Sequence, residues 1–150
     1  MDIIFWRHAD AVDGIPDLSR QLTPKGLRQA EKVAAWLTAR IPDETRILVS
    51  PAARTRQTAE ALGRPFSIEP ALAPDRDAMS LLLAADWPHA GDSVLLVGHQ
   101  PTLGRAAMLL LTGHEAELTV RKAGLVWISN RVRDGSQQNV LRAAISPDLA

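Results

Sequence analysis

The chain has 150 residues, 46% hydrophobic and 23% charged, a composition typical of a soluble globular protein of one domain's size. Its 17 basic and 17 acidic residues balance, so no overall basic excess favours binding to nucleic acid or to a membrane surface. The absence of cysteine excludes disulfides, thiolate catalysis and cysteine-ligated zinc. Because the first residues do not resemble a signal peptide and the apolar runs are too short to span a bilayer, we expect a cytoplasmic protein.

The N-terminal segment predicts a buried strand followed by a loop and a long helix. Residues Asp2 to Trp6 are β-branched and aromatic, and this run stops abruptly at Arg7-His8. A polar stretch from Asp10 to Leu22 predicts a loop. Thr23-Pro24 then supplies an N-cap and a proline at the first helical position, and the helix should end before Pro42. The apolar face of this helix is expected to contain Leu27, Ala30, Val33, Ala34, Leu37 and Ile41.

The next segment predicts a second strand and helix. Arg46 to Val49 form a short apolar strand. Ser50-Pro51 repeats the cap and proline, and it is expected to open a helix that runs to about Leu62. Gly63 would end that helix, and Ser67 to Glu69 predict a minor strand.

The second half of the chain continues the alternation of strands and helices. Residues from Asp75 to Trp87 predict a helix with Met79, Leu82 and Leu83 facing inward. Ser93 to Val97 predict a fully buried strand, and the helix from Leu103 to Thr112 should stop at Gly113.

Two closing strands, Leu125 to Ser129 and Val140 to Ile145, complete the pattern. Strands alternating with helices predict an α/β fold, a three-layer α/β/α sandwich with a mostly parallel central sheet. The sequence contains no internal repeat, low-complexity tract or linker, so we predict a single domain over residues 1–150.

Three predicted strands end in residues suited to binding phosphate. The first ends in Arg7-His8, the second leads through Ser50-Pro51 to Arg54, and the central strand ends in Gly98-His99. Parallel strands present their carboxyl ends along one edge, where ligands bind in open α/β sheets. Arginine binds phosphate oxygens bidentately, and a neutral imidazole can attack phosphorus to form a covalent intermediate. This chemistry needs no metal, and we expect no cofactor.

The same residues resemble a known family. Arg7-His8-Ala9, the run from Ser50 to Ala59, and Val97 to Pro101 resemble three motifs of the histidine phosphatase (phosphoglycerate mutase-like) superfamily. The short length and the run from Asp17 to Gly26 resemble its SixA branch, the phosphohistidine phosphatases. The resemblance covers residues 2 to about 129 and implies a phosphoglycerate mutase-like fold.

The resemblance also implies roles for individual residues. His8 would be the nucleophile that becomes phosphorylated, while Arg7, Arg54 and His99 would hold the phosphoryl group. Arg20 would be a further phosphate-binding residue, although it could simply be a loop cation. Ala9 stands where the family usually has glycine.

The sequence shows no clear general acid, and Asp75 and Asp77 are only near the expected region. An imidazole, with a reference pKa of about 6.5, leaves more readily than an alkoxide. The missing acid therefore favours phosphohistidine or another labile phosphoryl donor over sugar phosphates as the substrate.

These observations predict a phosphatase that dephosphorylates a histidine-containing phosphotransfer or other signalling protein. One alternative is a small-molecule phosphomonoesterase of the same superfamily, whose partner would be a phosphorylated metabolite. Another is a non-catalytic phosphate-binding module. We predict neither nucleic acid nor a membrane as a partner.

Overall fold

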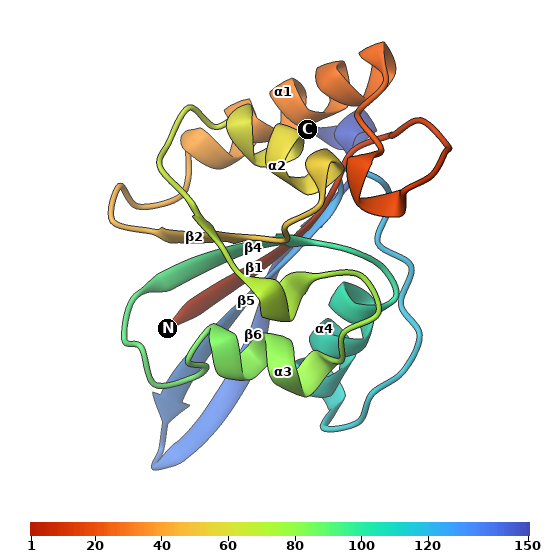
Figure 1. Cartoon of the computed structure of the whole chain (residues 1–150). Coiled ribbons are helices and arrows are strands. Elements are labelled where there is room, and N and C mark those ends of the chain that lie inside the picture. Colours follow the sequence, from red (N-terminus) through yellow and green to blue (C-terminus); the bar gives the residue numbers. More distant parts are fainter.

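A six-stranded sheet runs through the protein, whose computed structural model describes residues 1–150 (Figure 1). Its strands are β1 (Asp2–Arg7), β2 (Arg46–Val49), β3 (Ser67–Ile68), β4 (Ser93–Gly98), β5 (Leu125–Arg133) and β6 (Ser136–Ile145). They are ordered β3-β2-β4-β1-β5-β6. The three pairs from β3 to β1 are parallel, whereas β5 pairs antiparallel with both β1 and β6. The predicted mostly parallel sheet is therefore confirmed, with an antiparallel hairpin at one edge.

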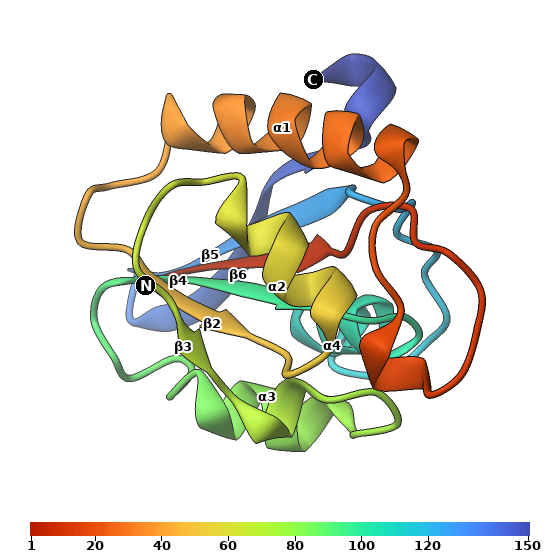
Figure 2. The same ribbon diagram turned by 45° about the horizontal axis from the view of Figure 1, so that its top comes forward.

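Helices cover both faces of the sheet. They are α1 (Pro24–Thr38), α2 (Ala53–Glu60), α3 (Ala78–Ala84) and α4 (Thr102–Thr112), with short 3₁₀ turns η1 (Asp17–Ser19), η2 (Pro70–Leu72) and η3 (Pro147–Leu149). Helices α1 and α2 pack on one face and α3 and α4 on the other (Figures 1 and 2). This arrangement confirms the three-layer α/β/α prediction. None of the helices has the length and apolar character that crossing a bilayer requires.

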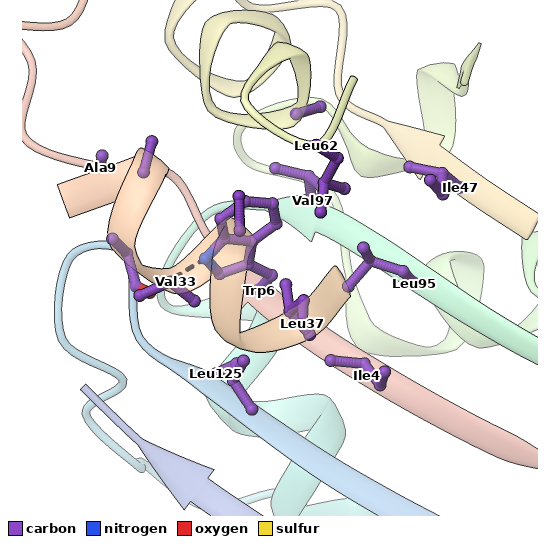
Figure 3. Close-up of a cluster of buried hydrophobic side chains, with 14 of the residues drawn as sticks. Ile4, Trp6, Ala9, Val33, Leu37, Ile47, Leu62, Leu95, Val97 and Leu125 are labelled. Atoms are coloured by element: carbon purple, nitrogen blue, oxygen red, sulfur yellow. Dashed lines mark hydrogen bonds between the residues drawn. The ribbon is translucent and has the colours of Figure 1, made fainter. Parts of the chain in front are cut away.

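The alternation of side chains along β1 divides the core into two clusters. Ile4 and Trp6 face α1 and α2, whereas Ile3 and Phe5 face α3 and α4. In Figure 3 the Trp6 ring lies among side chains from α1, from β4 and from Leu62, which follows α2. Its indole Nε1–H donates to the Ala123 carbonyl at 2.9 Å, so the polar atom of this buried ring is satisfied. These contacts fix the end of β1, immediately before His8.

One of the two predicted helix caps is present and the other is wrong. The Thr23 hydroxyl oxygen accepts the Gly26 N–H at 3.0 Å, with Pro24 at the first position of α1. Helix α2 instead begins at Ala53, because Ala52 is still extended and provides no side-chain cap. The predicted cap Ser50 lies before that extended segment, and its hydroxyl bonds a histidine of the site described below.

Three side chains predicted to face inward are exposed: Leu27, Met79 and Leu83. Helix α1 approaches the Asp10 backbone through Gly26, so Gly26 is buried in place of Leu27, whereas the predicted Ala30, Val33, Ala34 and Leu37 are buried as expected. Helix α3 similarly buries Ala78, Leu81 and Leu82.

Several predicted boundaries also move. Ile41 is buried but lies beyond the last residue of α1, Thr38. Helix α3 starts at Ala78 because the Asp77 carboxylate caps it by accepting the Ser80 N–H at 2.7 Å. The loop predicted from Asp10 to Leu22 contains the turn η1 and a bridge between Ala11 and Leu22. The predicted stop at Gly113 is confirmed, since this residue is the C-cap of α4 with a φ angle of 82°. Helix α2 ends earlier than predicted, at Glu60, and Gly63 follows its cap with a φ angle of 63°.

Candidate active site

The ends of three neighbouring parallel strands bring the predicted residues together. Strand β1 pairs Arg7 with Gly98 of β4, and the His8 N–H donates to the Gly98 carbonyl at 3.1 Å. The rings of His8 and His99 consequently lie 5.3 Å apart between centroids. Arg54 reaches the same place from the first turn of α2, which follows β2. These side chains face a cavity of about 360 Å³, which we call the catalytic cavity. Its full lining consists of Arg7, His8, Ala11, Asp13, Asp17, Arg20, Arg54, Pro74, Asp75, His99, Gln100 and Lys122.

The His8 imidazole is buried and held in one tautomer. Its Nδ1 lies 2.8 Å from the Ala9 carbonyl oxygen. Because a carbonyl only accepts, Nδ1 carries the hydrogen and Nε2 keeps its lone pair. Burial lowers the pKa of His8 to about 4, with further lowering by Arg54, Arg7 and Arg20 against an opposing effect of the Ala9 carbonyl. At neutral pH the ring is uncharged and Nε2 can act as a nucleophile.

Ala9 fits the position where the resemblance leads one to expect glycine. It is fully buried, and its φ angle is not positive. Its N–H donates to the Thr58 hydroxyl at 3.0 Å. The backbone next to His8 thus needs no glycine.

His99 is the second buried imidazole of the catalytic cavity. Its Nε2 lies 2.8 Å from the Ser50 hydroxyl, while its buried Nδ1 has no protein partner. Burial lowers the pKa of His99 to about 3, and the positive charge of Arg54 adds to this effect. Ser50 is therefore a positioning residue that the sequence pattern assigned to a helix cap instead.

Arg7 and Arg54, two of the three predicted phosphate-binding arginines, are anchored through part of the guanidinium. Arg54 is buried, and its Nη1 donates to the Asp17 carbonyl at 2.9 Å. Arg7 donates from Nη1 to the Val120 carbonyl at 2.9 Å. In each residue the buried Nε–H has no partner in the protein. Fixed orientation combined with unused donors is what a bidentate oxyanion site requires.

Asp17 joins Arg54 to the predicted Arg20. One carboxylate oxygen lies 3.1 Å from Nη2 of Arg54, and the other lies 3.1 Å from Nη1 of Arg20. The hydrogen bond from Arg20 lowers the pKa of Asp17, and Arg54 lowers it further. Asp17 therefore stays ionised and cannot serve as a general acid at neutral pH. Nothing in the sequence marked Asp17 for this bridging role.

The structure separates the two acidic candidates. Asp75 lines the catalytic cavity and makes no ion pair. Its backbone is in the left-handed region, with a φ angle of 66°. Asp77 lies outside the cavity, because its carboxylate caps α3. Two further lining residues, Gln100 and Lys122, were not predicted from the sequence. Lys122 pairs with Asp10 at 2.7 Å.

Comparison with known proteins identifies the class. Residues 3–76 match the model of the histidine phosphatase superfamily (branch 1). The phosphohistidine phosphatase SixA of Escherichia coli is 34% identical over 122 residues, covering 75% of this chain and 76% of that protein. An uncharacterized protein of Mycobacterium tuberculosis is 37% identical over 128 residues, or 77% of each chain. The chain belongs to the histidine phosphatase superfamily, and its enzyme class is phosphatase.

A solved structure narrows this class to the SixA type. The structure of the protein histidine phosphatase SixA complexed with tungstate matches with a TM-score of 0.82 and 28% identity, covering 99% of both chains. This likeness and the identity to the Escherichia coli protein confirm the SixA resemblance predicted from the motifs.

Proposed function

We propose that this protein is a phosphohistidine phosphatase that acts on a signalling or phosphotransfer protein through a phosphorylated His8. In the first step the lone pair on Nε2 of His8 attacks phosphorus, and the bond from phosphorus to the substrate imidazole breaks. The freed imidazole nitrogen takes a proton from solvent. Water then attacks the phosphoryl group on His8, releasing inorganic phosphate and restoring the neutral ring. The observation that carries this proposal is the uncharged, tautomer-fixed His8 beside two arginines with unused donors.

The surrounding groups would stabilise the charge that develops on the phosphoryl oxygens. Arg7 and Arg54 line the catalytic cavity, and each keeps an Nε–H without a partner in the protein, so we assign both residues to those oxygens. The unpartnered Nδ1 of His99 gives a third group for the same anion, with its ring held by Ser50. We assign Arg20 a supporting role, because its Nε and Nη1 already donate to Val12 and Asp17.

The acid–base groups favour a good leaving group. Of the three carboxylates that line the catalytic cavity, Asp13 and Asp17 pair with Arg20, which leaves Asp75 alone without an ion pair. A phosphohistidine substrate loses an imidazole with a reference pKa of about 6.5, so its departure depends little on a strong acid.

An exposed apolar surface beside the cavity suits a protein substrate. Val12, Ile15 and Leu18, called here the apolar rim, lie in the same loop as the lining residues Asp13 and Asp17. The side chain of Ile15 is almost entirely in solvent, with the residue 97% exposed. A macromolecular substrate docked over the cavity would cover these side chains, whereas a small phosphorylated molecule would not.

The direct test uses a histidine-containing phosphotransfer domain phosphorylated with ³²P. The wild-type protein should release inorganic phosphate and carry label transiently, whereas His8→Ala should do neither. Full activity of His8→Ala would overturn the proposal. Absence of any label on the wild-type protein would favour a non-catalytic phosphate-binding module.

A matched pair of variants tests the preference for a protein. Ile15→Ser should reduce kcat/KM for the phosphoprotein several-fold and leave hydrolysis of p-nitrophenyl phosphate unchanged. Val132→Ser is the control, because Val132 is also exposed but lies in the β5–β6 hairpin at the opposite end of the sheet (Figure 1). Equal effects of the two variants on the phosphoprotein would argue against docking at the apolar rim.

A small-molecule phosphomonoesterase is the second candidate, and the position of Asp75 in the catalytic cavity favours it. Alkoxide departure would need this carboxyl group as an acid. Efficient turnover of sugar phosphates, lost in Asp75→Asn, would support this activity over the phosphoprotein activity.

A further inference from the structure

A second cavity lies next to the catalytic cavity and shares two residues with it. It measures about 440 Å³ and is lined by Arg7, Gln29, Thr119, Arg121, Lys122, Pro147 and Asp148. Arg7 and Lys122 line both cavities. Because the bond from Arg7 to the Val120 carbonyl fixes its guanidinium beside Thr119 and Arg121, this side chain stands between the two spaces.

The adjoining cavity is rich in hydrogen-bond donors that have no partner. The Arg121 guanidinium lines the cavity and makes no hydrogen bond or ion pair; its charge acts on Asp148, whose pKa is lowered first by the Ser146 hydroxyl and also by Arg121. Gln29 uses its side-chain carbonyl to accept the Asp10 N–H at 3.0 Å, which leaves its amide N–H groups free.

The charges of the adjoining cavity favour an anion. Three of its lining residues are cations, against the single carboxylate of Asp148. That carboxylate already accepts the Ser146 hydroxyl at 2.5 Å. No histidine lines this cavity, so it lacks the imidazole to which the proposed phosphoryl transfer is assigned.

We propose that the adjoining cavity is a specificity subsite that binds the carboxylate of an acidic side chain close to the phosphorylated histidine of the substrate protein. This inference rests on the proposed function, since the phosphoryl group must occupy the catalytic cavity at the same time. A carboxylate matches the planar fork of Arg121 and can be reached by the free amide of Gln29. The subsite would therefore select phosphohistidines that have a nearby Asp or Glu.

The test measures binding without turnover. Peptides carrying a non-hydrolysable phosphonate analogue of phosphohistidine would be made with one Glu placed one to four residues to either side, each paired with a Gln version. Isothermal titration calorimetry would compare the wild-type protein, Arg121→Gln and Arg133→Gln. Arg133 is the matched control, because it is an exposed arginine at the far end of β5.

At one or more positions the Glu peptide should bind the wild-type protein about fivefold more tightly than its Gln partner, as expected for one charge-assisted contact. Arg121→Gln should abolish this ratio and leave the affinity for the Gln peptide unchanged, whereas Arg133→Gln should preserve the ratio. If the Glu and Gln peptides of every pair bind with equal affinity, or if the affinity ratio persists in Arg121→Gln, the proposed subsite is wrong but the proposed function is not affected. Failure of all the peptides to bind the wild-type protein would overturn the proposed function and the subsite with it.

Discussion

At the scale of single residues, the chemistry of the catalytic cavity depends on how His8 is protonated. Its burial among three arginines disfavours the imidazolium ion, and the Ala9 carbonyl fixes the remaining hydrogen on Nδ1. A histidine on the surface would be partly protonated near neutral pH, since its reference pKa is about 6.5. Packing, and not the residue type alone, thus keeps this side chain uncharged, as the proposed nucleophilic role requires.

The protonation state of His8 can be measured directly. We expect two-bond ¹H–¹⁵N NMR spectra to show the Nδ1–H tautomer from pH 8 down to about pH 5, with protonation only as the pH approaches 4. A midpoint near the ordinary value of about 6.5 would contradict the burial argument. Because an unfolded chain takes up the proton at higher pH, stability should be complete above that ordinary value and should fall as the pH decreases from there toward 4.

The role of Arg54 is testable against a neighbour on the same helix. Arg54→Lys keeps the charge but removes the planar fork, so kcat/KM should fall by about 10²-fold. Arg56→Lys is the matched control, because Arg56 is exposed on α2 and lines neither cavity. Steady-state kinetics with a phosphorylated phosphotransfer domain would check both variants. Similar losses of kcat/KM in the two variants would show that Arg54 has no particular role in binding the phosphoryl group.

At the scale of elements, the start of α1 positions the loop that follows His8. The Asp10 carbonyl approaches Gly26 so closely that an added Cβ would lie 2.0 Å from the oxygen. Thr23 caps the helix and also donates to the Asp10 carboxylate at 2.7 Å. Helix and loop therefore form one unit, and this unit explains why the buried stripe includes Gly26 and excludes Leu27.

Gly26→Ala tests this contact. Helix propensity alone would stabilise the protein by about 1 kcal/mol, but the clash with backbone should prevail. We expect the free energy of unfolding to fall by about 1–3 kcal/mol in urea denaturation. Arg28→Ala, on the exposed side of α1, should change stability by less than about 0.5 kcal/mol. A stabilised Gly26→Ala protein would show that the loop can move away without cost.

The turn between β5 and β6 has a sequence signal that the predicted strand boundaries leave out. Asp134-Gly135, with φ angles of 50° and 77°, forms the turn between the two strands. This dipeptide is a strong hairpin signal, and it would have extended the predicted strands from Ser129 to Arg133 and from Val140 back to Ser136.

At the scale of the whole molecule, the catalytic cavity draws on segments from residue 7 to residue 122. A bound oxyanion would connect these segments and would bind only the folded state. Tungstate at about 100 times its Kd should therefore add about 2.7 kcal/mol of stability, which corresponds to a rise in Tm of about 5–10 °C for a chain of this size. Scanning calorimetry should show the rise in the wild-type protein and a much smaller one in Arg54→Lys. A Tm that does not change when tungstate is added would argue against an oxyanion site.

The sequence by itself determined the order of strands and helices, the three-layer class and the main candidates for phosphate chemistry. These rest on patterns a few residues long, such as the apolar run before Arg7-His8 and the strand leading to Gly98-His99. Because parallel strands share one direction, the sequence predicted that these candidates lie along one edge of the sheet.

Only the tertiary structure decided which groups hold those candidates in place. The bond from Arg54 to Asp17 joins residues 37 positions apart, and the bond between Ser50 and His99 joins residues 49 apart. The same packing separated Asp75 from Asp77 and made the His8 ring neutral. Local propensity acts over a few neighbouring residues, whereas such partners and the degree of burial depend on how whole elements pack.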